Sequence, residues 1–207
     1  SRYLKKYQNT FEFLSNNIRI MENTFTLVKR FKKPFLFASS QMSNMTYSNY
    51  GILKNLGEKY SQILDGLVVK FWNVYGPEED LDKSHVITDF ILKAYNTKKI
   101  DMMTDGTEVR QFLHATDCSE CIEILSNNYD SIPRSKELHI TNFEWNSILD
   151  VANIIASRID DVEIIPAKSK DEVQLDKRNE PDDFILKYWK PKISLEDGIA
   201  DMIEYYK

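Results

Sequence analysis

The stretch that decides the fold reads Phe37-Ala38-Ser39-Ser40, followed ten residues later by Tyr50-Gly51-Ile52-Leu53-Lys54. An apolar run ends there in two serine hydroxyls, and the next segment has the pattern of a helix with a tyrosine and a lysine four residues apart. Residues at that spacing lie on one face of an α-helix. The sequence therefore predicts a short strand over about 35–38, a loop, and a helix that brings a phenol and an ammonium group close together.

These side chains are suited to proton transfer. A free tyrosine has a pKa of about 10 and is a poor base at neutral pH, but a nearby cation lowers this pKa because it stabilises the phenolate. A serine hydroxyl beside the phenol can share its proton, so Ser40, Tyr50 and Lys54 together could take a proton from an alcohol. For an isolated tyrosine–lysine pair, a surface location would be the better interpretation.

The surrounding elements alternate between helix and strand. Before the stretch, apolar residues recur at helical spacing at Leu14, Ile18, Met21, Phe25 and Val28. They predict an amphipathic helix over about 13–31. Ser48 is suited to cap a helix over about 49–64, and 67–72 is expected to form a second strand. Near-continuous apolar strands that alternate with helices are typical of a parallel sheet covered on both faces.

The pattern changes after Gly76-Pro77. Strands are expected over 100–104 and 109–114, on either side of an Asp105-Gly106 turn. The other expected elements are a helix over 84–95, a helix capped by Asp117 through 125, a strand over 138–141, a helix over 145–158, a strand over 162–167, and a final helix whose Ser194 to Asp197 spacing is that of a capping box. The charged stretch 168–183 is expected to be a surface loop.

Composition is that of a globular protein. The 207 residues are 42% hydrophobic, enough for one domain or two closely packed ones. A net charge of −5 with well-mixed signs argues against nucleic acid or an anionic membrane as a partner. No apolar run reaches transmembrane length, so we expect a cytoplasmic protein. Cys118 and Cys121 could form half of a metal site or a redox pair, but no second Cys/His pair has metal-ligand spacing, and buried helix cysteines without a metal are the better interpretation.

Four further motifs follow Ser39-Ser40 in order: Tyr50-x-x-x-Lys54, Phe71-Trp72-Asn73-Val74-Tyr75-Gly76-Pro77, Asp105-Gly106-Thr107-x-x-Arg110-Gln111-Phe112-Leu113-His114-x-x-Asp117, and Pro191-Lys192-Ile193-Ser194-Leu195-Glu196-Asp197-Gly198-Ile199. This series resembles the extended short-chain dehydrogenase/reductase family, and more narrowly its NAD-dependent epimerases and dehydratases of nucleotide sugars. Each motif alone is modest, whereas the ordered series is specific and covers nearly the whole chain.

The resemblance implies a Rossmann-like, doubly wound parallel α/β sheet with a smaller α+β substrate-binding domain. Residues 1–76 and about 109–128 would belong to the NAD-binding domain, and about 77–108 and 129–207 to the nucleotide-sugar-binding domain. The family's cofactor site begins with a strand, a Gly-rich turn and a helix. No such Gly-rich motif occurs here, so we expect the first βαβαβ unit to be missing and the 207 residues alone not to bind NAD tightly.

The resemblance also assigns roles by position. Ser40 would be the catalytic hydroxyl, Tyr50 the base, and Lys54 the residue that holds the nicotinamide ribose and lowers the tyrosine pKa. The expected cofactor-binding residues are Asn17, Ser39, Tyr50, Lys54 and Phe71, for NAD or NADP. The expected substrate-binding residues are Gln41, Asn73, His85, Val86, Arg110 and Arg178. A planar guanidinium suits a diphosphate, but an ion pair remains the alternative for Arg110, and a surface arginine explains Arg178 equally well.

The residues after Ser40 bear on the reaction. Family dehydratases have an Asp-Glu pair there, whereas this chain has Gln41-Met42, whose amide and thioether do not exchange protons at neutral pH. Dehydration is therefore disfavoured. The resemblance of residues 39–45 to capsular heptose-modifying members favours NAD-dependent oxidation or reduction at C4 of a GDP-heptose-like nucleotide sugar, in bacterial surface polysaccharide synthesis.

Two alternatives remain, a nucleotide-sugar 4-epimerase and a non-catalytic nucleotide-binding remnant of the fold. The resemblance also implies a homodimer in which the Tyr50 helix and the long helix before it form a four-helix bundle. Both helices carry apolar residues beyond one narrow stripe, namely Phe25, Leu56, Tyr60 and Ile63. Burial against the sheet explains the same pattern.

Overall fold

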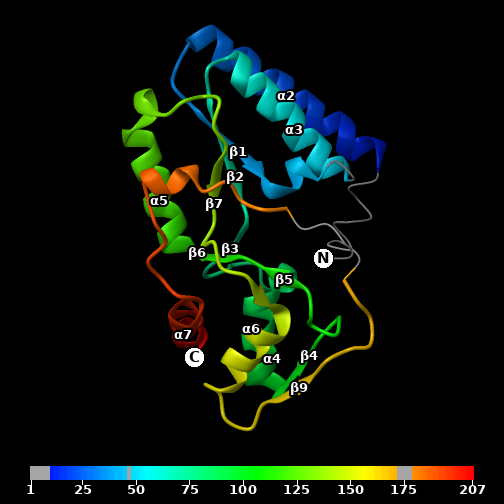
Figure 1. The fold of residues 1–207 in the computed structure, drawn as a ribbon. Helices are drawn as coiled ribbons and strands as arrows, with labels where there is room; N and C mark the ends of the chain where they lie inside the picture. Colours follow the sequence, from blue (N-terminus) through cyan, green and yellow to red (C-terminus); the bar gives the residue numbers. More distant parts are fainter. Residues whose placement is uncertain (1–9, 46–47, 172–178) are drawn as a thin grey trace. The chain divides into compact units, whose positions relative to one another are not determined.

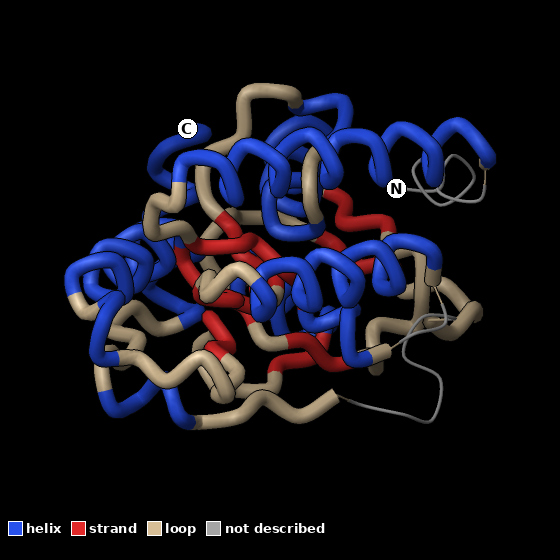
Figure 2. The backbone as a smooth tube through the Cα atoms, turned by 90° about the horizontal axis from the view of Figure 1, so that it is seen from above, coloured by secondary structure: helices blue, strands red, loops and turns tan. Residues whose placement is uncertain are grey.

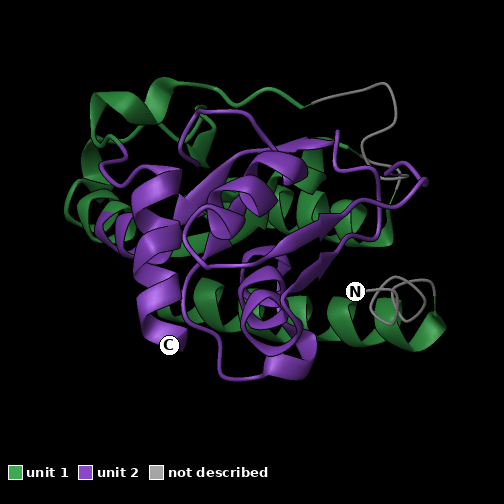
Figure 3. Ribbon diagram, turned by 90° about the horizontal axis from the view of Figure 1, so that it is seen from below, with its two compact units in different colours: residues 1–72, 121–140, 179–190 green, residues 73–120, 141–178, 191–207 purple. Residues whose placement is uncertain are grey.

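The computed structural model describes residues 10–45, 48–171 and 179–207 (Figure 1). The chain divides into two compact units (Figure 3). The first contains residues 1–72, 121–140 and 179–190, and the second contains residues 73–120, 141–178 and 191–207. The helices, strands and loops of both can be followed in Figure 2.

A three-stranded parallel sheet forms the centre of the first unit, in the order β1-β2-β7. The strands are β1 (Leu36–Ser40), β2 (Leu67–Phe71) and β7 (Leu138–Ile140). The helices are α2 (Phe11–Phe31), α3 (Asn49–Ile63) and the part of α5 (Ala115–Asn127) from Cys121 onward, with short 3-10 helices η1 (Gln41–Asn44), η3 (Tyr129–Ser131) and η4 (Phe184–Lys187). The predicted parallel sheet is therefore confirmed, and β1 extends further than expected because its pairing with β2 continues to Ser40 and Phe71.

Local signals explain where the first helices begin. The Thr10 hydroxyl accepts a hydrogen bond from the Phe13 N–H, at 3.2 Å, so α2 begins two residues before the predicted start. The Ser48 hydroxyl accepts one from the Gly51 N–H, at 3.0 Å, which confirms Ser48 as the cap of α3. α2 packs against α3 (Figure 1) through Phe25, whose ring stacks on Tyr60 with 5.0 Å between the centroids.

The second unit contains three two-stranded sheets. β3 (Asn73–Tyr75) pairs in parallel with β6 (Phe112–His114), β4 (Lys99–Asp101) in parallel with β9 (Glu163–Ile165), and β5 (Val109–Arg110) antiparallel with β8 (Asn146–Ser147). Its helices are η2 (Leu81–Lys83), α4 (Val86–Thr97), α6 (Ile148–Ala156), α7 (Leu195–Tyr206) and the first residues of α5. Helices α4, α6 and α7 share one apolar core that includes Ile91, Val151, Ile155 and Ile199.

The strands expected on either side of Asp105-Gly106 are present as β4, β5 and β6, and each pairs with a strand far away in the sequence. One local prediction in this unit was wrong. Asp117 does not cap α5, which begins at Ala115; its carboxylate instead accepts hydrogen bonds from the N–H groups of Lys192 and Ile193, both at 2.9 Å. The capping role of Ser194 is confirmed, since its hydroxyl accepts a hydrogen bond from the Asp197 N–H at 3.1 Å.

The two units also differ from the expected domain boundaries. Residues 129–140 lie in the first unit because β7 pairs with β2, and 179–190 lie there too. Residues 109–120 lie in the second unit, where β6 pairs with β3. Within the part of the chain that the structure describes, no helix combines the length and the apolar character that a membrane span needs.

The fully buried His139, in the middle of β7, is hydrogen-bonded to the residue that follows β2 and to the residue that precedes β7. The His139 Nδ1 atom accepts a hydrogen bond from the Trp72 indole, at 3.1 Å, and an indole N–H can only donate. The proton of the neutral ring is therefore on Nε2, which donates to Glu137 at 2.7 Å. This hydrogen bond contributes most to lowering the pKa of the Glu137 carboxyl, and Lys70 adds to the effect.

The Glu137→Gln variant tests this arrangement. Because the folded-state pKa lies below the ordinary 4.5, the carboxylate stabilises the fold above about pH 4.5 and this contribution is lost as pH falls. We expect a loss of about 1 kcal/mol in the free energy of unfolding at pH 7, small because the side chain is half exposed, and a smaller loss below pH 4.5. Urea unfolding at pH 7 and below pH 4.5 measures the free energy of unfolding of each variant. Glu204→Gln, at an exposed position, is the control. If the loss of stability in Glu137→Gln were the same at both pH values, the Glu137 carboxylate would not be the stabilising group.

Candidate functional site

Ser40, Tyr50 and Lys54 lie together in the first unit. Ser40 ends β1 and caps η1, where its hydroxyl accepts a hydrogen bond from the Met42 N–H at 3.2 Å. The Tyr50 hydroxyl is hydrogen-bonded to the Ser40 side chain. One helical turn further along α3, the Lys54 ammonium lies 5.6 Å from the centre of the Tyr50 ring. The three residues that the sequence singled out are thus neighbours.

The close approach of α3 to the chain after β1 produces this arrangement. A Cβ atom at Gly51 would collide with the backbone carbonyl oxygen of Met42, so only glycine allows the first turn of α3 to lie against η1. The Lys54 Nζ atom donates a hydrogen bond to the Ala38 carbonyl at 2.6 Å, which holds the next turn of the helix to β1. Tyr50 is therefore held beside Ser40 by two contacts that the residues after it on α3 make with backbone carbonyls.

The pKa of Tyr50 differs from the sequence-based expectation. Burial raises the pKa of the phenol above its ordinary value of 10.0, and the hydrogen bond to Ser40 offsets part of that rise. We predicted a pKa lowered by Lys54, but the ammonium group is directed to a backbone carbonyl, and burial lowers the pKa of Lys54 itself. The phenol therefore keeps its proton at neutral pH in this arrangement.

The other candidates in the first unit have mostly structural contacts. Asn17 lies inside α2, and its amide donates to the Phe13 carbonyl at 2.8 Å. Ser39 is buried and donates to Glu58. Phe71 ends β2 and pairs in register with Ser40. Gln41 is buried at the start of η1, and its carbonyl accepts a hydrogen bond from Asn179 at 3.0 Å.

Four substrate candidates belong to the second unit. Asn73 begins β3 and donates to the Gln111 carbonyl at 3.1 Å. His85 precedes the first residue of α4, Val86, and its side chain contacts the Glu78 carboxylate. Arg110 forms an ion pair with Asp171 at 2.6 Å, so the ion pair considered as its alternative role is present. The remaining candidate, Arg178, lies outside the described residues.

Polar atoms near Arg110 are left unsatisfied. Glu108 Oε2, two residues before it, and Asn146 Nδ2, on its register partner in β8, are buried without a hydrogen-bond partner among the described residues. Buried polar atoms in proteins are usually paired, so these two indicate a place for further polar contacts.

The cysteines and the potential metal ligands lie outside the candidate site described above. Cys118 and Cys121 are buried, as predicted, and are not joined in a disulfide; burial raises the pKa of Cys118 to about 11. A thiol with so high a pKa is a poor nucleophile. Among the residues that the structure describes, no three His, Cys, Asp or Glu side chains are grouped as metal ligands.

Two charged residues beside the candidate site are not among those predicted from the sequence. Glu58 follows Lys54 by four residues on α3, and Lys70 lies in the middle of the apolar strand β2. Both are buried, and their charged groups lie 3.5 Å apart. A lysine inside an otherwise apolar strand and the repeated spacing of Tyr50, Lys54 and Glu58 were the available signals.

Curated relatives share part of the chain. GDP-L-fucose synthase of Sinorhizobium fredii is 30% identical over 142 residues, which are 65% of this chain and 44% of that protein. UDP-glucuronic acid decarboxylase 1 of Danio rerio is 26% identical over 145 residues, 67% of this chain and 33% of that protein. The chain thus spans less than half of the length of these two relatives.

Solved structures share the fold. The NAD-dependent NDP-hexosamine 5,6-dehydratase TunA matches with a TM-score of 0.80 at 17% identity, over 98% of this chain and 72% of that one. WbmF of Bordetella bronchiseptica matches with a TM-score of 0.74 at 21% identity, over 89% and 62%. These matches confirm the Rossmann-like α/β fold class. The family model described as "NAD dependent epimerase/dehydratase family" matches residues 2–141, and the chain therefore belongs to that family.

Proposed function

We propose that the protein catalyses the NAD-dependent oxidation or reduction of C4 in a nucleotide-linked sugar. The observation that carries this proposal is the Tyr50 phenol, hydrogen-bonded to Ser40 and followed by Lys54 on the same face of α3. Such a phenol can exchange a proton with a sugar hydroxyl or keto oxygen. NAD supplies the hydride acceptor or donor when bound.

Lys54 fits a role beside the nicotinamide ribose. An ammonium group has three N–H donors, and one of them donates to the Ala38 carbonyl. The remaining donors suit ribose hydroxyls, while the bond to β1 fixes the direction of the side chain. Asn17, Ser39 and Phe71 complete the proposed cofactor set by resemblance.

The protonation state of Tyr50 gives the phenol one role in the reduction of a keto-sugar and another in the oxidation of a sugar hydroxyl. Because its pKa is raised, the phenol holds a proton that it can give to the C4 oxygen when a keto-sugar is reduced. In the oxidation direction, the phenolate must form first. Oxidation should therefore become faster as pH rises toward the Tyr50 pKa, whereas reduction needs the protonated form.

Arg110 and Asn73 are the proposed contacts for the nucleotide diphosphate, with Gln41, His85 and Val86 as further substrate contacts. A guanidinium that now binds the Asp171 carboxylate can bind phosphate oxygens with the same planar geometry. The unsatisfied Asn146 amide, on the register partner of Arg110, adds a donor for a phosphate oxygen.

The class of substrate is supported by the names of the relatives, which include GDP- and UDP-linked sugars. We propose a GDP-heptose-like sugar, on the resemblance of residues 39–45, and a role in bacterial surface polysaccharide synthesis in the cytoplasm. Gln41 and Met42 provide no acid–base pair for dehydration.

The Tyr50→Phe variant of the full-length protein tests the proposed role of the phenol. We expect turnover to fall by about 10²–10⁴-fold, because the proton carrier is lost, with nucleotide-sugar binding nearly unchanged. Reduced-nicotinamide absorbance measures turnover and calorimetric titration measures binding. Tyr60→Phe, also on α3 and stacked on Phe25, is the matched control and should keep full activity. Retained turnover in Tyr50→Phe would disprove the assignment, and a stereoisomer formed without net cofactor change would favour a 4-epimerase.

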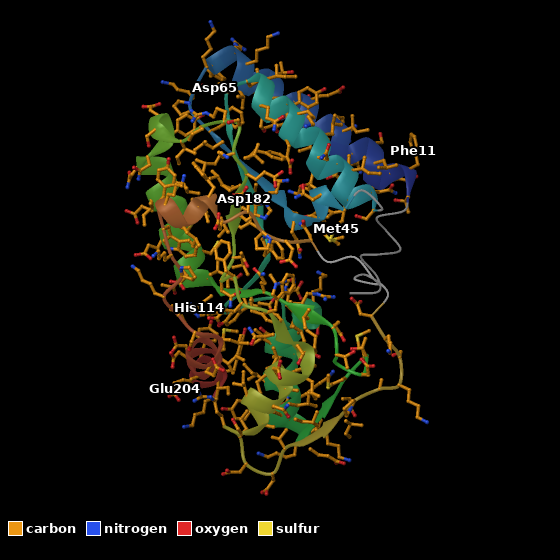
Figure 4. The ribbon with its side chains drawn as sticks, viewed as in Figure 1. Phe11, Met45, Asp65, His114, Asp182 and Glu204 are labelled. Carbon is orange, nitrogen blue, oxygen red and sulfur yellow. The ribbon has the colours of Figure 1, made fainter. Side chains whose placement is uncertain are left out.

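We also propose that two copies of the chain pair through α2 and α3. Phe25 and Tyr60 pack inside the unit, but both helices carry large exposed apolar residues. They recur at helical spacing on α2 and on α3: Ile20, Leu27 and Phe31, then Ile52, Leu56 and Ile63, of which Ile63 is 82% exposed. Phe11, at the start of α2 (Figure 4), is exposed as well. Apolar stripes on two neighbouring helices suit the same stripes on a second copy.

The double variant Leu56→Glu/Ile63→Glu tests this pairing. Two buried, unpaired carboxylates would disfavour the interface, so we expect the dimer to dissociate and the mass from light scattering to halve. Asn153→Glu, on the exposed face of α6, is the control and should leave the mass unchanged. A dimer that persists in the double variant would show that these stripes are not the interface.

A further inference from the structure

Lys70 is a charged residue at the centre of the first unit. It lies in the middle of β2 and is only 1% exposed, although its strand is otherwise apolar. An isolated buried ammonium is strongly disfavoured, so such a group must be paired. Its Nζ atom contacts Glu137 at 2.7 Å, Glu58 at 3.5 Å and the side-chain oxygen of Asn44. Of these partners, Glu58 is buried on α3 and only 4% exposed.

The Glu58 carboxylate connects α3 to two strands at once. One oxygen accepts a hydrogen bond from the Ser39 hydroxyl on β1, and the other faces Lys70 on β2. Ser39 and Lys70 are register partners, so their side chains lie on the same face of the sheet. Glu58 therefore binds two adjacent positions of the sheet, which allows few orientations of the helix.

The same helix carries the candidate catalytic groups. Tyr50, Lys54 and Glu58 are spaced by four residues, and eight residues span about 12 Å along a helix. A contact at Glu58 therefore controls how α3 is rotated about its axis, and Tyr50 moves with that rotation. Ser39 is also the neighbour of Ser40, so the bond to Glu58 fixes the strand end from which the Ser40 hydroxyl projects.

An apolar pair at these positions would fill the space without fixing a direction. Buried ion pairs contribute little net stability compared with apolar residues of similar size, but they demand a specific geometry. We propose that Glu58 and Lys70 are positioning residues, whose buried pair fixes the rotation of α3 on the sheet and thereby holds Tyr50 and Lys54 in place beside Ser40. This inference rests on the proposed function of that site.

Four variants of the full-length protein test the pair: Glu58→Gln, Lys70→Met, Lys70→Arg and the double variant Glu58→Gln/Lys70→Met. Glu58→Gln leaves Lys70 with Glu137 as its carboxylate partner, whereas Lys70→Met leaves the buried Glu58 carboxylate without its cation. We expect lower stability in both, more so for Lys70→Met, and a 10–100-fold lower kcat with KM changed less than threefold. A displacement of about 1 Å is sufficient for such a loss of rate. Lys70→Arg keeps the charge and should recover most of kcat.

The double variant separates positioning from stability. It removes both buried charges, and the half-exposed Glu137 carboxylate keeps its hydrogen bond from His139, so it should be more stable than Lys70→Met while kcat stays low. A full recovery of kcat in the double variant would mean that the pair only stabilises the fold, and would overturn the inference. The double variant also keeps the test valid if a single variant does not fold.

Val69→Ala is the matched control. Val69 is buried on the same strand, but its side chain faces the opposite side of the sheet. It should lose stability and keep kcat; a loss of kcat equal to that of Glu58→Gln would overturn the inference. Tyr50→Phe is measured in parallel. If Tyr50→Phe is inactive and Glu58→Gln has normal kcat, only this inference fails, whereas an active Tyr50→Phe overturns the proposed function and this inference with it.

Discussion

The direct contact between the start of α3 and the backbone that follows β1 is the constraint on which the candidate site depends. Gly51 lies against the Met42 carbonyl, and the Lys54 ammonium binds the Ala38 carbonyl. Neither contact requires a particular partner side chain. The phenol of Tyr50 is therefore held near the Ser40 hydroxyl by main-chain geometry, which varies less than side-chain packing when neighbouring residues change.

Features determined by local sequence could be predicted from it. Ser48 and Ser194 cap helices as expected, since a hydroxyl before a helical pattern has its partner three residues ahead. The proximity of Tyr50 and Lys54 follows from helix periodicity alone. The parallel sheet of the first unit followed from the alternation of apolar strands with helices.

Features that depend on distant partners could not be predicted in the same way. The strands flanking Asp105-Gly106 pair with β3, β8 and β9, and nothing in their own residues specifies those partners. Asp117 was predicted to cap a helix because it stands near the start of a helical pattern. Its actual partners, two backbone N–H groups, lie 75 and 76 residues away and could not be recognised from the sequence. The raised pKa of Tyr50 depends on burial, which a spacing rule does not measure. Glu58 and Lys70 were missed although a lysine inside an apolar strand was a signal, because the sequence does not show that this lysine lies beside Glu58 of α3.

The buried pair of Glu58 and Lys70 also affects how the site responds to heat. The hydration of charged groups becomes less favourable as temperature rises, so the desolvation penalty of a buried ion pair falls. Hydrophobic stabilisation per unit area, by contrast, reaches a plateau. The alignment of α3 on its sheet should therefore weaken less on warming than the aromatic packing of Phe25 that holds α2 to the same helix. In a warming protein, α2 would loosen first, while the helix that carries Tyr50 keeps its orientation on the strands that it packs against.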